Sequence, residues 1–191
     1  MREKLKYINR KGIPYYFREV SGKRGTQIVC SKMEFGNDLA AIPDTHEVVE
    51  SPNGQVSCRK TMKYDLLPEE IALAKKLCPK LVKKNVRVIV EMKKKAIHIH
   101  SANADSMNEL AQYVTGSGSV PTRILAAMEK NLRFEPALKL ELSKKPERIF
   151  LVSRMCWRGK CDWMFLDEGS LEKLLRKYVP HIEQESFFEL F

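Results

Sequence analysis

The sequence lacks any long apolar run. No uninterrupted apolar stretch reaches the roughly 18 residues that a membrane-spanning helix requires, so we expect no membrane partner. The first residues, Met1–Lys6, also lack the apolar segment of a secretory signal peptide. These two absences predict a protein that works in the cytoplasm.

Signatures of catalysis and of bound cofactors are missing as well. The five cysteines include one close pair, Cys156 and Cys161, and no second pair that would complete a zinc site. The loop at residues 116–119 lacks the Gly-Lys-Ser/Thr of a phosphate-binding P-loop. We therefore expect reduced thiols, no cofactor, no metal ion and no catalytic residue that can be named.

Acidic residues are in the minority, and the excess of positive charge is uneven. The net charge is +10, from 34 Lys and Arg against 24 Asp and Glu. Residues 1–95 contain 21 basic and 11 acidic residues, a difference of +10, whereas residues 96–191 contain 13 of each. This asymmetry is typical of a surface that attracts polyanions, although it also serves solubility alone.

Short alternating segments bounded by Gly, Pro and Asn dominate the pattern. They predict antiparallel strands over residues 4–8, 14–20, 26–31, 47–50, 55–59, 86–92, 96–101, 137–143, 148–156 and 161–166. Apolar residues at helical spacing predict about four helices, over residues 68–82, 105–114, 120–132 and 170–178. Hairpins with helices between them predict an α+β fold with antiparallel sheets. The charge step predicts a small basic β-rich region, residues 1–62, before an α+β core domain, residues 63–191, on which the C-terminal tail docks.

Three local features can be predicted in more detail. The Ser-Pro-Asn-Gly segment at residues 51–54 predicts a tight hairpin turn. In the hairpin that follows the first helix, the alternation of apolar residues places Met92 opposite Ile97. Pro79 is expected to kink or split the helix that begins at Pro68, because its ring clashes with the preceding turn.

The first hairpins combine cations with aromatic side chains, which are the residue types that contact phosphates and stack on bases. Strand alternation puts Tyr15 and Phe17 on one face of the strand and Tyr16 and Arg18 on the other. At least one aromatic side chain should therefore lie on the basic face. A two- or three-stranded ribbon also fits a DNA major groove. The alternative is a small sheet whose cations are merely solvated. The predicted nucleic-acid-binding residues of this region are Arg10, Lys11, Tyr16, Arg18, Lys23 and Arg24.

Further lysines lie on the polar face of the helix from Pro68 and in the hairpin turn after it. A lysine offers a point charge without bidentate geometry, which favours phosphate contact over the reading of bases. The alternative is an ordinary solvated face. The predicted nucleic-acid-binding set therefore also includes Lys76, Lys80, Lys83 and Lys94.

A second surface is predicted in the hairpin over residues 154–163, which concentrates residue types common at the centres of protein interfaces. The alternative is that both indoles cover the sheet. The predicted partner-binding residues are Arg154, Trp157, Arg158 and Trp163.

His98 and His100 share one strand face, and the register places Glu91 opposite His98. Two imidazoles and a carboxylate can ligate a metal ion, but no further ligand cluster at characteristic spacing accompanies them. We therefore expect a cross-strand contact between Glu and His rather than a metal site.

Four segments resemble a family of small uncharacterised bacterial proteins: residues 6–12 together with Tyr15 and Tyr16, residues 51–56, residues 177–181 and residues 185–190. The resemblance touches both ends of the chain. It implies a stand-alone bacterial protein of the cytoplasm, and it implies no catalytic or binding residue.

These observations rank three functions. The first is a non-enzymatic nucleic-acid-binding protein that contacts the phosphates of DNA or RNA through its basic N-terminal half. The alternative is a protein-interaction or adaptor module that uses the Trp hairpin or the apolar C-terminal tail. The third is an enzyme of unrecognised type, which the missing motifs disfavour without excluding.

Overall fold

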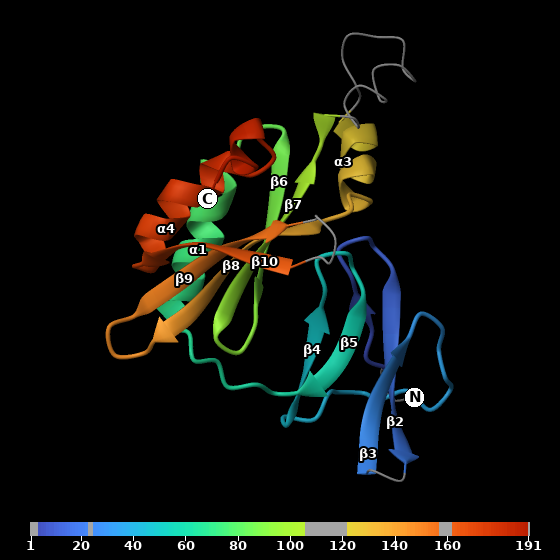
Figure 1. The fold of residues 1–191 in the computed structure, drawn as a ribbon. Coiled ribbons are helices and arrows are strands. Elements are labelled where there is room, and N and C mark those ends of the chain that lie inside the picture. Colours follow the sequence, from blue (N-terminus) through green and yellow to red (C-terminus); the bar gives the residue numbers. More distant parts are fainter. Residues whose placement is uncertain (1–3, 23–24, 106–121, 157–161, 191) are drawn as a thin grey trace. The chain divides into compact units, whose positions relative to one another are not determined.

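A computed structural model describes residues 4–22, 25–105, 122–156 and 162–190. The chain divides into two compact units, Met1–Met62 and Lys63–Phe191. Within the described residues the fold is α+β and dominated by antiparallel sheets, as its ten strands against three α-helices show (Figure 1).

The N-terminal unit contains two small antiparallel sheets. One has the order β1 (Tyr7–Ile8), β2 (Pro14–Gly22) and β3 (Gly25–Ser31), and the other pairs β4 (His46–Glu50) with β5 (Val56–Lys60). Tyr15 and Phe17, which share one face of β2, are buried with Val56 in a common core. The predicted alternation, with Tyr15 and Phe17 on one face of β2, is confirmed, and this face is the buried one.

The hairpin turn between β4 and β5 has the predicted position. Ser51 accepts a backbone hydrogen bond from Gly54 at 2.9 Å and donates one to Gln55 at 2.8 Å. Gly54 has a φ of 80°, a left-handed conformation that glycine adopts without strain.

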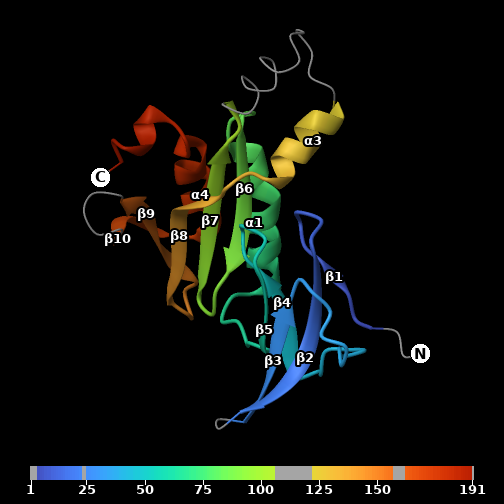
Figure 2. The same cartoon turned by 90° about the vertical axis from the view of Figure 1, so that its right-hand side faces the viewer.

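The C-terminal unit is built on one five-stranded antiparallel sheet. Its strand order is β10 (Asp162–Gly169), β9 (Ile149–Cys156), β8 (Glu135–Lys144), β7 (Ala96–Asn103) and β6 (Val86–Met92). Helix α1 (Pro68–Leu81) packs on β6 and β7, and helix α4 (Leu171–Tyr178) packs on β9 and β10. Both helices cover the same face of the sheet (Figures 1 and 2).

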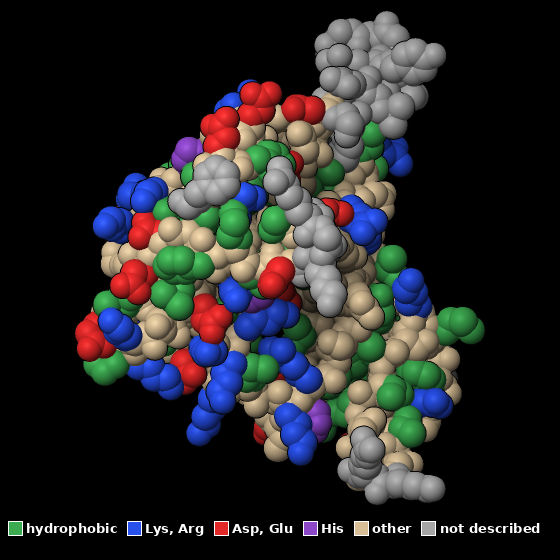
Figure 3. All heavy atoms as spheres, in the orientation of Figure 1, with side chains coloured by type: hydrophobic (Ala, Val, Ile, Leu, Met, Phe, Trp, Pro, Cys, Tyr) green, Lys and Arg blue, Asp and Glu red, His purple; other side chains and the backbone are tan. Residues whose placement is uncertain are grey.

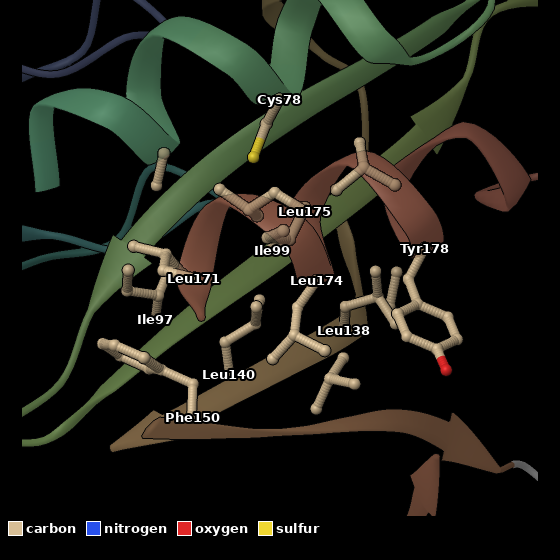
Figure 4. Packing of buried hydrophobic residues seen from close by; sticks show 14 of the residues in the cluster. Cys78, Ile97, Ile99, Leu138, Leu140, Phe150, Leu171, Leu174, Leu175 and Tyr178 are labelled. Atoms are coloured by element: carbon tan, nitrogen blue, oxygen red, sulfur yellow. The ribbon is translucent and has the colours of Figure 1, made fainter. Parts of the chain in front are cut away.

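The main core lies between this face and the two helices. Leu138, Leu140 and Phe150 project from the sheet toward Leu174 and Leu175 of α4 (Figure 4). Alternate strand residues therefore face the core, and the residues between them form the opposite face of the sheet.

The predicted register of the β6–β7 hairpin is confirmed. Met92 pairs with Ile97, and Glu91 pairs with His98. Ile97 is fully buried, so His98 lies on the face that the two helices do not cover.

The helices differ from the prediction in two respects. The described residues contain three α-helices, α1, α3 (Thr122–Lys130) and α4, fewer than the four expected. The expected helix over residues 105–114 lies almost wholly outside the described residues. None of the described helices is both long and apolar enough to cross a membrane.

Of the two effects expected at Pro79, a kink or a split of the first helix, the split does not occur. Helix α1 continues through Pro79 and ends at Leu81. A proline this close to the C-terminal end removes a hydrogen bond to Lys75 but leaves only two helical residues beyond it, so the packed part of the helix is preserved.

The C-terminal tail folds as two short 3-10 helices, η1 (Val179–His181) and η2 (Glu185–Phe187), rather than as one α-helix. Ile182 and Phe187 are buried in the main core, and Leu190 packs against it. Phe188 stays 65% exposed.

Candidate functional site

One buried side chain holds two turns of the N-terminal unit together. The Asn9 side chain is buried, and its Oδ1 accepts hydrogen bonds from the backbone N–H groups of Lys11 at 3.0 Å and Ile13 at 2.8 Å. Its Nδ2 donates to the Gly54 carbonyl at 2.6 Å. Asn9 therefore shapes the turn that carries Lys11 and ties it to the β4–β5 turn.

Gly54 allows the close approach of these turns. A Cβ atom placed on Gly54 would lie 3.2 Å from Asn9 Nδ2 and 3.3 Å from two carbon atoms of the Lys11 side chain. The missing side chain therefore leaves room for both neighbours, in addition to permitting the positive φ.

A cleft of about 550 Å³ lies beside these turns, within the size range of small-molecule sites. Two of its lining residues, Lys11 and Lys32, are cationic, and none is acidic. The other lining residues are Asn9, Ile13, Tyr15, Cys30, Ser31, Asn53, Gly54, Gln55 and Val56. The lining is therefore suited to an anion.

Two other cations of this unit are already paired with carboxylates. Lys4 contacts Glu34 at 2.7 Å, and Arg59 contacts Glu47 at 2.8 Å. Lys11 and Lys32, in contrast, form no ion pair within the described part of the chain.

Arg10 has a different environment from its neighbour Lys11. Glu50 accepts a hydrogen bond from the Arg10 backbone N–H at 2.8 Å and one from the Tyr7 hydroxyl at 2.9 Å. Arg10 is half-buried, and burial lowers the pKa of its guanidinium while the nearby Glu50 carboxylate opposes that shift. Arg10 is also not among the residues that line the cleft.

Tyr16 and Arg18 are not among the residues that line the cleft. Tyr16 and Arg18 are half-buried on the other face of β2, where the Arg18 guanidinium lies 4.2 Å from the centre of the Phe35 ring. Lys23 and Arg24 lie outside the described residues.

The other four predicted nucleic-acid contacts belong to the C-terminal unit. Lys76 and Lys80 are exposed on the side of α1 that faces away from buried Ala74 and Cys78, and Lys83 follows the end of the helix. Lys94 is exposed in the β6–β7 turn. On the one face of this unit that Figure 3 shows, basic and acidic side chains are interspersed.

The two predicted partner-binding residues that the structure describes, Arg154 and Trp163, do not share one face of the sheet. Arg154 is 7% exposed, and its guanidinium donates to the backbone carbonyls of Leu190 at 3.1 Å and Phe188 at 3.4 Å. Trp163 pairs with Met155, one position along from Arg154, so it lies on the opposite face of the sheet. Trp157 and Arg158 lie outside the described residues.

A cluster of titratable side chains lies on the sheet face opposite α1 and α4. Glu91 Oε2 and His100 Nε2 are 3.1 Å apart, and the rings of His98 and His100 stack with centroids 6.3 Å apart. The contact with His100, supported by Lys93, lowers the pKa of Glu91 to about 2. Burial lowers the pKa of His98 to about 4.

Trp163 and Lys139 extend this cluster across the sheet. The Trp163 ring meets the His98 ring edge to face, with centroids 5.4 Å apart, and Lys139 Nζ lies 5.4 Å from the centre of the Trp163 ring. The predicted Glu–His contact is therefore present, but it is made chiefly by His100, and its neighbours come from two further strands, β8 and β10.

Sequence reasoning missed Lys32 and the polar residues Asn53 and Gln55 as members of the cleft. They come from segments well separated along the chain, and no local pattern signals that these segments meet. No family model, no curated protein and no solved structure matches the chain. The functional argument therefore depends on the geometry of the chain itself.

Proposed function

We propose that the protein is a non-enzymatic nucleic-acid-binding protein of the cytoplasm that holds phosphates of DNA or RNA in the cleft of its N-terminal unit. The observation that carries the proposal is the lining of this cleft, which contains Lys11 and Lys32 and no acidic residue. Phosphate oxygens need cations that are not already neutralised, and these two lysines meet that requirement within the described residues.

Uncharged groups of the cleft support the same ligand. Asn53 and Gln55 line it beside the lysines, and amide side chains are common donors to phosphate and sugar oxygens. Lysines supply a point charge without the rigid, planar set of donors that arginine offers. We therefore propose binding with little sequence specificity.

The exposed residues Lys76, Lys80 and Lys83 are proposed to contact further phosphates of the nucleic acid. Lys76 and Lys80, four positions apart, lie on the side of α1 opposite its buried residues, and the exposed Lys83 follows the end of the helix. Because α1 also carries the acidic residues Glu69 and Glu70 in its first turn, we give these lysines the smaller share of the binding free energy.

The experiment is a salt series of fluorescence anisotropy measurements with labelled double-stranded DNA and single-stranded RNA. The Lys11→Gln/Lys32→Gln variant is compared with Lys144→Gln/Lys173→Gln, which removes the same charge from exposed positions elsewhere. The logarithm of the association constant for double-stranded DNA falls linearly with the logarithm of the salt concentration. In the cleft variant this dependence should become less steep, by about 0.9 for each phosphate that the protein no longer neutralises. The control variant should keep the slope of the parent protein.

Two results would overturn the proposal. One is the absence of binding by micromolar protein at low salt. The other is an equal loss of affinity in the cleft variant and the control, because net charge rather than the cleft would then account for the binding.

A further inference from the structure

The sheet face opposite α1 and α4 presents three metal-ligating side chains at one place. Glu91 lies on β6, and His98 and His100 lie on the neighbouring strand β7. The side chains of Glu91 and His100 are only 18% and 13% exposed, so water competes little for them. Two residues apart on one strand, His98 and His100 project to the same side as Glu91.

The ligand atoms of the three side chains lie close to one another. One ligand atom from each of Glu91, His98 and His100 lies within 4.8 Å of the other two. Two ligands bound at about 2.1 Å in tetrahedral geometry are about 3.4 Å apart. Glu91 Oε2 and His100 Nε2 are 3.1 Å apart, so this pair needs only a small adjustment to share an ion.

A β-bulge adjoins the cluster. The register between β7 and β8 shifts between Ile99, which pairs with Leu138, and His100, which pairs with Pro136. The extra residue, Ala137, bends β8 beside His100. Bulges are common next to functional sites, and this one lies on β8 beside His100.

We propose that Glu91, His98 and His100 form a binding site for a divalent transition-metal ion of the zinc type. Two imidazoles and one carboxylate are a common protein ligand set for zinc, and three protein ligands leave a coordination position open. The site lies in the C-terminal unit, and its existence does not depend on the proposed binding of nucleic acid.

The surroundings of the site limit its affinity. Lys93 contacts Glu91 Oε1 at 2.6 Å and competes for that carboxylate. Lys139 places a second positive charge near His98, because both side chains contact the Trp163 ring. We therefore expect binding in the micromolar range, and we expect Lys139→Met to tighten it because a neighbouring cation repels the ion.

The test uses the metal-stripped full-length chain with Trp157→Phe, which leaves Trp163 as its one tryptophan. Because the Trp163 ring lies against His98, Co²⁺ bound at the site should quench its fluorescence in a saturable way, and Zn²⁺ should compete. Equilibrium dialysis with Zn²⁺ should give one equivalent bound.

Polar substitutions that preserve size separate this site from adventitious binding. Loss of a residue that only supports a metal ligand weakens metal binding by about 10–100-fold. His98→Gln and His100→Gln each remove a ligand, so each should weaken binding by more than this. The control His46→Gln/His181→Gln changes the other two histidines of the chain and should leave the affinity unchanged. Circular dichroism verifies that each variant is folded.

The proposal is overturned if Co²⁺ and Zn²⁺ fail to saturate the protein up to about millimolar concentration, far above the range expected for a built site. It is equally overturned if a folded His98→Gln/His100→Gln variant retains the affinity of the parent protein. Ions held by thiolates of the five cysteines would produce this second result.

Discussion

The buried amide of Asn9 donates to the carbonyl of Gly54 across a distance of 2.6 Å, although the two residues are 45 positions apart. This contact joins the turn that carries Lys11 to the turn between β4 and β5, and the cleft opens beside both. The geometry of the proposed phosphate site therefore depends on a polar side chain that need not touch the ligand.

Replacement of Asn9 by Ala should destabilise the protein. The backbone N–H groups of Lys11 and Ile13 and the Gly54 carbonyl would lose their shared partner, and each buried group left unsatisfied costs about 1–3 kcal/mol unless water reaches it. Urea denaturation should show a loss of about 2–4 kcal/mol. The control is Asn37→Ala at an exposed position, where the change should stay within about 0.5 kcal/mol. Equal stabilities of the two variants would contradict the structural role of Asn9.

Gly54 and Gly12 form a matched pair for a second experiment. Both have a φ of 80°, but a Cβ on Gly12 would meet no atom within 4 Å, whereas one on Gly54 would crowd Asn9 and Lys11. Gly12→Ala should cost about 1–2 kcal/mol from backbone strain alone, and Gly54→Ala should cost more. Gly54→Ala should also weaken nucleic-acid binding more than Gly12→Ala does. Urea denaturation measures the stability of each variant, and fluorescence anisotropy measures its binding. If the two variants behave alike in both measurements, the close packing around Gly54 does not shape the cleft.

The parts of the fold that the sequence predicts well are those that local rules determine. Alternation of apolar residues defines the register of Met92 and Ile97, because a shift by one residue would turn every side chain to the wrong face. The turn at residues 51–54 follows in the same way from its Pro-Asn-Gly composition. The expected split at Pro79 fails because helical packing outweighs one missing hydrogen bond near a helix end.

The candidate sites are less accessible to sequence reasoning. The cleft unites segments around residues 9–15, 30–32 and 53–56, and their meeting is a tertiary event without a local signal. The Glu91–His98 pairing follows from strand register, but the 3.1 Å contact is a diagonal one with His100, and period-2 alternation does not predict it. The buried state of Arg154 depends on where the C-terminal tail docks, which residue spacing does not reveal.

The stability of the C-terminal unit should depend on pH through Asp167. The side chain of Lys177, the backbone N–H of Glu168 and the hydroxyl of Tyr178 bind its carboxylate and lower its pKa to about 2. The pKa of Asp167 is lower in the folded protein than in the unfolded chain, so its ionised carboxylate stabilises the fold. This stabilisation is complete above about pH 4 and disappears as the pH falls through about 2. Asp167→Asn should therefore be less stable than the parent protein at pH 7, by about 1 kcal/mol at most because the pair is partly solvated.

Denaturant titrations at pH 7 and near pH 2 test this expectation. The difference between the parent protein and Asp167→Asn should be present at pH 7 and should vanish near pH 2. Glu168→Gln, at the exposed neighbouring position, serves as the control and should show a much smaller difference at pH 7. A destabilisation by Asp167→Asn that is the same at both pH values would assign the effect to packing rather than to charge.

Two adjacent phenylalanines of the C-terminal tail differ in how deeply they are buried. Phe187 is buried in the main core, with the Arg154 guanidinium 6.0 Å from its ring centre, whereas Phe188 is 65% exposed. Removal of a buried phenylalanine side chain costs about 3–5 kcal/mol, so Phe187→Ala should lower the free energy of unfolding by about that amount. Phe188→Ala, its matched control, should change the stability by less than about 1 kcal/mol.

This pair of variants also separates the two roles considered for the tail. If the tail stabilises its own core, thermal unfolding will distinguish Phe187→Ala from Phe188→Ala, and neither substitution will change the oligomeric state. If the tail instead serves a partner protein, both variants will keep the melting temperature of the parent protein, because neither ring would then contribute to the fold. The packing of Phe187 and Leu190 against the main core favours the first result.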